Sequence, residues 1–280
     1  MCNNRLKPRK KIHPFLNIFV LLCSLINIFP IVWMLYSSFK TQKEFTTNPL
    51  ALPHEIALGN FKEAMEFGHL FGGFLNSLLI SVISVVLIIA IGFIVGYIMA
   101  RFRFGGKGIL NGIFMIALLV PIHALLAPMF IEFKYMHLLD HWYTLILPYV
   151  TFELPVAIYL CSNMVASLPQ EVEESAVLDG CSFLQRLTKV VFPMCKPIIA
   201  TVGIMAFLSC WNEFVFGLTL VSRESLKTLQ VRLAAFSGFK VVQYPRLMAA
   251  LTLATLPVLL VYFFCHNKII EGMTQGAVKG

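Results

Sequence analysis

The chain has 280 residues, of which 58% are hydrophobic and 13% are charged, and its mean hydropathy is +0.81. Soluble domains carry about twice that share of charged residues, so the composition excludes a water-soluble globular protein and predicts a chain solvated largely by membrane lipid. The net charge of +8 does not indicate a nucleic-acid-binding protein, because the basic residues are scattered between apolar runs.

The N-terminal segment, residues 1–14, holds five basic residues within its first eleven positions and precedes an uncharged apolar run. Positive charge of this kind holds a segment on the cytoplasmic face of a membrane. The apolar run is longer than the core of a signal peptide, which has about 7–15 residues, and it lacks a clear small-residue cleavage site. We therefore expect a retained first span with a cytoplasmic N-terminus.

Six segments are apolar and long enough to cross the hydrocarbon as helices, which takes about 20 residues each. Basic residues are denser in the loops that this order places inside the cell, so both termini are expected to be cytoplasmic. The predicted fold class is all-α: one polytopic membrane domain over 15–280 with six transmembrane helices. The expected spans lie near residues 15–37, 73–100, 109–131, 143–165, 197–221 and 246–266.

The loop at 167–196 is the most informative connector, because it is too long for a simple turn and too apolar for a solvated loop. Its pattern predicts two short helices. Ser167 and Gln170 fit a capping box at the start of the first, Gly180 supplies a left-handed stop, and Ser182 caps the second. A cytoplasmic helix pair of this kind suits docking into a groove on a partner, and a pair lying against the membrane or the spans is the alternative.

Within this loop, Glu174-Ser175-Ala176, then Gly180, then Val190 and Phe192-Pro193 keep the spacing of the "EAA" loop of ABC importer permeases. The chain resembles that family, with Ser175 in place of Ala, Val190 in place of Ile and Phe192 in place of Leu. The resemblance implies that this loop forms a coupling helix pair that docks into a cleft on an ATPase subunit. The coupling residues that it implies here are Glu174, Ser175, Ala176, Asp179, Gly180 and Pro193.

Four further stretches resemble the maltose-type, carbohydrate-uptake branch of these permeases, at 37–40, 76–78, 211–214 and 272–280. This resemblance implies a subunit of the prokaryotic plasma (inner) membrane that translocates a sugar or a related solute. The implied partners are an extracytoplasmic solute-binding protein, a second homologous permease in a heterodimer, and two ATP-binding-cassette ATPase subunits. The cytoplasmic tail at 267–280, with Gly276 and Lys279, resembles one that reaches into the ATPase dimer.

Three polar residues in the spans, Glu153, Asn212 and Glu213, are candidates for the solute pathway. An ionised carboxylate at membrane depth costs at least ~2.5–3.5 kcal/mol, so each glutamate should face protein or a water-filled path. For Glu213 the alternatives are a structural hydrogen bond with the partner permease and a place at the outer interface. Glu153 departs from the family pattern, so the resemblance assigns it no role. The alternatives for Glu153 are a hydrogen bond to a sugar hydroxyl and a structural hydrogen bond. His123 is a cavity residue or, more commonly for a lone histidine, a packing residue.

Other functions are less well supported by the sequence. The chain has no Gly-rich phosphate loop, so ATP hydrolysis is expected in a separate chain and no enzyme activity in this one. An intramembrane enzyme is the alternative from another class, but no nucleophile turn or His-Glu-x-x-His motif is present. A channel would need a filter loop, which is also missing. No Cys/His ligand spacing predicts a metal site, and no cofactor is expected. A permease for a non-sugar solute stays open.

Overall fold

The computed structural model describes residues 14–236 and 243–277. Helices and their connecting loops make up these residues, with no β-strand among them, which confirms the all-α class. Four helices are long and apolar enough to cross a membrane. They are α1 (Pro14–Ser37), α4 (Leu70–Arg101), α7 (Ile146–Ser167) and α14 (Tyr244–Ala277).

The segment expected as a third span, 109–131, is not one helix. It consists of α5 (Lys107–Ala117), then η1 (Ile122–Leu125) and α6 (Leu126–Tyr135), with a bend of 94° at the break. Pro121 explains the break, because proline has no N–H to donate and disfavours helical geometry in the residue before it. If each bent pair counts as one span, the described residues contain up to six.

The segment expected as a fifth span, 197–221, is also interrupted. α11 (Lys196–Asn212) ends before Glu213, whose backbone is extended, and α12 (Val215–Leu220) follows as a short separate helix. At its other end α11 meets the preceding helical segment, residues 183–194, at 79°. Prolines at 193 and 197 surround this second bend, where a continuous helix would need their missing N–H groups.

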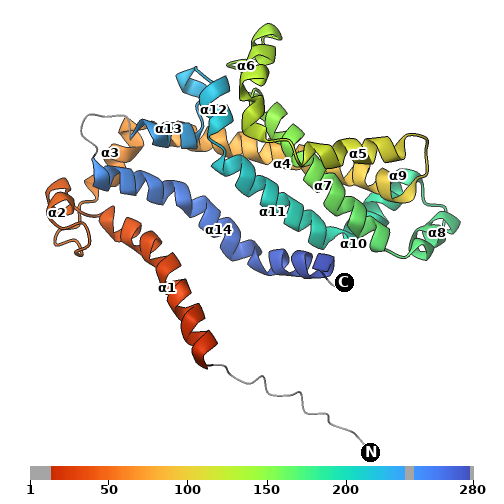
Figure 1. The fold of residues 1–280 in the computed structure, drawn as a ribbon, viewed down its shortest axis with the longest axis horizontal. Coiled ribbons are helices and arrows are strands. Elements are labelled where there is room, and N and C mark those ends of the chain that lie inside the picture. The colour runs from red at the N-terminus through yellow and green to blue at the C-terminus, as the bar shows by residue number, and fades with distance from the viewer. Residues whose placement is uncertain (1–13, 237–242, 278–280) are drawn as a thin grey trace, which may run out of the picture.

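The central helix of the bundle is α4, which packs most extensively against α7 and also against α11 (Figure 1). α4 approaches α7 closely because Gly92 and Gly96 face it: a Cβ built on Gly96 would lie 2.8 Å from Cβ of Cys161 and 3.0 Å from the backbone N of Ser162. Small residues permit this kind of helix approach in membranes. α14 packs on the far side of α11, and α1 leans away from the body beside α14.

Short helices gather at the two ends of the bundle (Figure 1). At the end where α4 begins lie α2 (Gln42–Thr47), α3 (Gly59–Phe67) and α13 (Leu229–Ala235), with η3 (Glu224–Leu226) nearby. At the opposite end lie α8 (Gln170–Leu178), α9 (Phe183–Gln185), the π-helical turn η2 (Arg186–Val191) and α10 (Phe192–Met194). α6 and α12 project from the middle of the bundle and contact each other.

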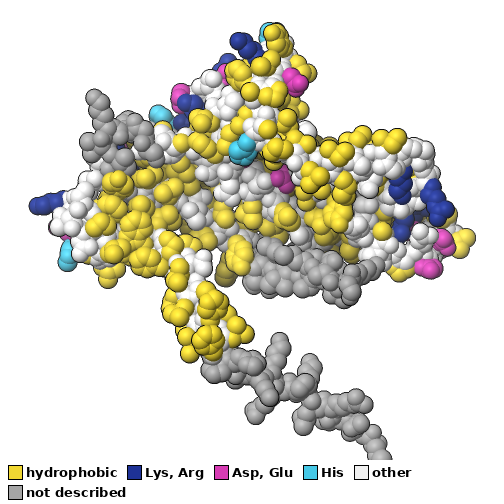
Figure 2. Space-filling view, in the orientation of Figure 1, with side chains coloured by type: hydrophobic (Ala, Val, Ile, Leu, Met, Phe, Trp, Pro, Cys, Tyr) yellow, Lys and Arg dark blue, Asp and Glu magenta, His cyan; other side chains and the backbone are white. Residues whose placement is uncertain are grey.

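Apolar side chains cover much of the outside of the spans (Figure 2). None of the apolar window of α1 is buried within the chain, whereas about a third of the window of α4 is. A soluble protein rarely exposes apolar surface on this scale, and lipid or other membrane subunits solvate such helices. Charged side chains are seen at the bundle end that carries α8 and α9 and also on the projecting part with α6 and α12 (Figure 2).

Candidate functional site

The inner helix pair, residues 170–194, is the first candidate site. α8 starts at Gln170, but Ser167 does not cap it, contrary to the expectation from the sequence: the Ser167 hydroxyl donates to the Met164 carbonyl, 2.7 Å away. Pro169 is the reason, because it forces the preceding Leu168 into an extended conformation (ψ 139°) and so separates α7 from α8.

The turn between the two helices has the predicted conformation. Gly180 has φ +80°, the left-handed geometry that ends α8. Ser182 then caps α9 in a reciprocal box: its hydroxyl accepts from N–H of Gln185 at 3.3 Å, and its own N–H donates to Oε1 of Gln185 at 2.9 Å. The angle between the two short helices is therefore set by this one turn.

Most of the residues expected to couple this chain to an ATPase share the outer surface of the inner helix pair. Glu174, Ser175, Asp179 and Gly180 are exposed, while Ala176 is buried beneath them. Beside these polar groups, the Leu178 side chain is 89% exposed and the Leu184 side chain 66% exposed. Exposed leucines edged by carboxylates form a surface suited to a protein partner. Pro193 is also exposed and lies in α10, before the bend into α11.

A second carboxylate of α8, Glu173, is buried, and the sequence did not single it out. Tyr97 and Arg101 of α4 donate to its two oxygens, each at 2.6 Å. Arg186 of η2 lies 3.8 Å from the same carboxylate. No local signal marks Glu173, because three glutamates lie in the first turns of α8 and its hydrogen-bond partners come from α4, more than 70 residues earlier.

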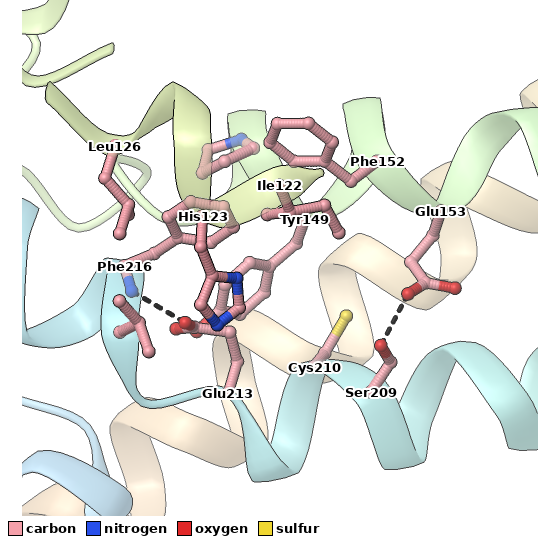
Figure 3. A pocket seen from close by; sticks show the side chains of 12 residues that line it. Ile122, His123, Leu126, Tyr149, Phe152, Glu153, Ser209, Cys210, Glu213 and Phe216 are labelled. Carbon is pink, nitrogen blue, oxygen red and sulfur yellow. Dashed lines mark hydrogen bonds between the residues drawn. The ribbon is translucent and has the colours of Figure 1, made fainter. Parts of the chain in front are cut away.

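The central cavity, of about 120 Å³, is the second candidate site (Figure 3). It lies between α7, α11, α12 and η1, where the two interrupted spans come together. It brings the two predicted glutamates and His123 to one place, although they come from three different segments. Its polar lining residues are His123, Tyr149, Glu153, Ser209, Cys210 and Glu213.

Glu213 is held entirely by this chain. Its carboxylate accepts from backbone N–H of Phe216 at 2.6 Å, from N–H of Gly217 at 3.1 Å, and from the Tyr149 hydroxyl at 2.9 Å. The first two bonds cap the free N–H groups at the start of α12, where a carboxylate is favourable. These bonds within the chain favour a structural role for Glu213, and a contact with a partner permease stays a prediction.

Glu153 is less constrained. One of its oxygens accepts from the Ser209 hydroxyl of α11, and Figure 3 shows the side chain directed along the cavity wall toward that serine. Asn212 does not line the cavity; its side chain is exposed and donates to the Leu208 carbonyl one turn back, at 2.9 Å. The cavity thus unites two of the three proposed pathway residues.

Two remaining predictions concern the tail and metals. Gly276 lies in the last turn of α14, and Lys279 lies outside the described residues. Over residues 14–236 and 243–277, no group of three or more His, Cys, Asp or Glu side chains is arranged to hold a metal ion.

The sequence matches the profile of a family described as "Binding-protein-dependent transport system inner membrane component" over residues 88–274. A putative ABC transporter permease protein of Caldicellulosiruptor sp. is 37% identical over 94% of this chain and 96% of its own length. The sulfoquinovosyl glycerol transport system permease protein of Agrobacterium fabrum is 32% identical over 91% and 90%. A chain of a bacterial ABC transporter that imports the acidic polysaccharide alginate has the same fold, with a TM-score of 0.79, 21% identity, and coverage of 95% and 99%.

Proposed function

This chain belongs to the family of binding-protein-dependent transport system inner membrane components, and from that premise we propose that it is the permease subunit of an ABC importer for a sugar or a related solute. It is a transport subunit and not an enzyme. An extracytoplasmic binding protein would deliver the solute, and ATP hydrolysis in separate subunits would drive the spans between outward- and inward-open states.

The observation that carries the proposal is the outer surface of the inner helix pair. Leu178, one turn after Glu174 in α8, and Leu184 of α9 are exposed at the same end of the bundle. Together these side chains offer an apolar anchor with a charged rim, which is the usual composition of a protein interface. We assign this surface to a cleft on the ATPase, with Glu174, Ser175, Asp179, Gly180 and Pro193 in or beside the contact and Ala176 supporting it from below. The tail at 267–280, including Gly276 and Lys279, is proposed as a second contact with the ATPase pair.

A second permease of similar fold is proposed to complete the pathway. The central cavity has a volume of only about 120 Å³. The helices α6 and α12 project from one side of the bundle, where they could contact a second permease. A heterodimer would place two such cavities around a common route.

The sugar class is supported by the chemistry of the central cavity as well as by the named relative. Glu153 and Ser209 supply acceptor and hydroxyl groups, and Phe152 stacks on Phe216 at the cavity wall with ring centroids 5.5 Å apart. Polar groups for hydroxyls beside aromatic surface suit a sugar. A non-sugar solute is the alternative. Calorimetry of candidate solutes binding to the cognate binding protein distinguishes a sugar from a non-sugar solute.

The deciding experiment is reconstitution in proteoliposomes of this chain with a second permease, the ATPase and the binding protein encoded beside it. We expect solute-stimulated ATP hydrolysis and uptake of labelled solute into the vesicles. A complex that forms but never hydrolyses ATP in response to loaded binding protein contradicts the proposal.

For Glu153 we expect the substitution Glu153→Gln to lower the initial rate of solute uptake by roughly tenfold, because a hydrogen bond to a charged acceptor contributes about 1.5–3 kcal/mol. The matched control is Glu132→Gln in α6, a glutamate outside the central cavity. Normal uptake by the Glu153 variant, at equal amounts of assembled complex, assigns Glu153 a structural role.

The orientation of the chain gives a separate prediction. Single cysteines placed at 103, 107 and 178 in a cysteine-free background should react with an impermeant maleimide only after the cells are opened, whereas a cysteine at 55 should react in intact cells. This pattern follows from the basic residues of the inner loops and the alternation of spans. Labelling of residue 178 from outside intact cells would contradict this orientation.

A further inference from the structure

The first helix of the inner helix pair, α8, is attached to the spans through few side chains, whereas Leu187 and Val191 of η2 are buried in the core of the bundle. Of the nine residues of α8, only Glu173 and Ala176 are buried. Ala176 contributes a single methyl group to packing. The firm attachment of α8 to the rest of the chain therefore depends mainly on Glu173.

Glu173 is joined to two other segments by polar contacts. Tyr97 and Arg101 reach it from α4, and Arg186 approaches it from η2. Arg101 uses a second nitrogen, Nη2, to donate to the carbonyl of Leu168 at the end of α7, 2.9 Å away. One carboxylate and two guanidinium groups thus connect α4, α7, α8 and η2. We name Tyr97, Arg101, Glu173 and Arg186 the junction cluster.

The junction cluster is mostly buried, although its residues line an open pocket at this end of the bundle. The side chains of Arg101 and Glu173 are each 10% exposed, whereas those of the Arg246–Glu63 pair at the other end of the bundle are 23% and 54% exposed. Partial burial makes the stability of each charged group depend on its partner. A charged group left without its partner there has neither full hydration nor an opposite charge beside it. Buried ion pairs add little net stability compared with apolar packing, but their directional bonds fix geometry.

We propose that Arg101 and Glu173 are positioning residues that clamp α8 to the inner ends of α4 and α7, so that a displacement of α8 by the ATPase moves these spans with it. This inference rests on the proposed function, and it assigns to the buried carboxylate Glu173 a task distinct from that of the exposed Glu174. Glu174 faces the partner, whereas Glu173 transmits the movement into the membrane. An apolar contact in its place would hold α8 to the bundle but allow it to slide.

The test is the number of solute molecules transported per ATP hydrolysed in the reconstituted complex. Glu173→Gln keeps the shape of the side chain and removes the charge that both arginines face. We expect the ATPase to co-purify with this variant and to hydrolyse ATP, while the transport ratio falls by about fivefold or more, the scale of typical coupling between sites. Tyr97→Phe, which removes one hydrogen bond and keeps the ring, should lower the ratio less.

Arg101→Lys gives a second test, because lysine keeps the charge but cannot hold Glu173 and the Leu168 carbonyl in one rigid fork. Its transport ratio should fall between those of the wild type and Glu173→Gln. The control is Glu63→Gln, the same chemical change in the Arg246–Glu63 pair at the opposite end of the bundle, which should leave the ratio unchanged.

The outcomes separate the inference from the function beneath it. If the wild-type complex shows no solute-stimulated hydrolysis, the proposed function fails and the clamp fails with it. If the wild type couples and all three junction variants transport the same amount of solute per ATP, the clamp alone is wrong. A lower yield of complex with a wild-type ratio in what assembles also overturns it, since that result shows a purely structural role.

Discussion

Gly180→Val is expected to reduce solute-stimulated ATP hydrolysis by roughly tenfold or more while the chain still inserts into the membrane. Gly180 has φ +80°, and a β-branched residue held there costs about 1–2 kcal/mol. A Cβ at this position would meet no atom within 4 Å, so the penalty is in the backbone and not in a clash. Relief of this strain requires a different turn, which changes the angle between α8 and α9 and misplaces Leu178 and Leu184 relative to the ATPase.

Two glycines of the neighbouring loop provide matched controls for that result. Gly105 has no positive φ and Gly106 has φ +85°, and a Cβ on either would also meet nothing within 4 Å. Gly105→Val should therefore behave like the wild type. Gly106→Val carries the same kind of strain in a turn outside the inner helix pair, so it should retain stimulated hydrolysis. Equal losses in Gly106→Val and Gly180→Val, measured per assembled complex, would show that general strain and not the docking angle is responsible.

Gly96→Leu is expected to abolish accumulation of the folded chain. The Cβ alone would lie 3.1 Å from the Ile158 carbonyl and 2.8 Å from Cβ of Cys161, so α4 and α7 would have to separate along their main contact. Overpacking of this kind costs about 1–3 kcal/mol or more, a large part of the stability of a typical domain. The measurement is the amount of monodisperse protein recovered from detergent-solubilised membranes.

The matched control for this prediction is Gly112→Leu in α5, where an added Cβ meets nothing within 4 Å. Leucine is also a better helix former than glycine by up to about 1 kcal/mol. This variant should be recovered in at least wild-type amounts. Comparable recovery of Gly96→Leu would mean that α4 and α7 are not packed as described.

The long spans could be placed from the sequence because uninterrupted apolar runs have few alternatives in a membrane. α1 and α4 begin within three residues of the expected positions. The two interrupted spans were harder, since apolar content does not report backbone continuity. A proline such as Pro121 favours a kink, but the size of the bend depends on what packs around it. Glu213 was recognised as unusual, yet its role as the cap of α12 required knowing that α11 ends there.

The site residues also divide into those with a local sequence signal and those that depend on long-range contacts. Gly180 and Ser182 were identified because a left-handed stop and a cap are local properties of the chain. Glu173 was not, because three glutamates crowd the start of α8 and the sequence does not say which one faces inward. The choice is made by Tyr97 and Arg101, more than 70 residues earlier in the chain. Long-range polar contacts of this kind have no local signal.

The pairing of α1 with α14 bears on the biogenesis of the chain. The first span leaves the ribosome long before the last, yet its main contact within the described chain is with that last span. Until α14 has been synthesised, α1 lies in the bilayer without this contact, which its strongly apolar sequence allows. A chain truncated before α14 would leave α1 without its main helix contact. Association of α1 with the bundle is therefore expected to follow the insertion of α14.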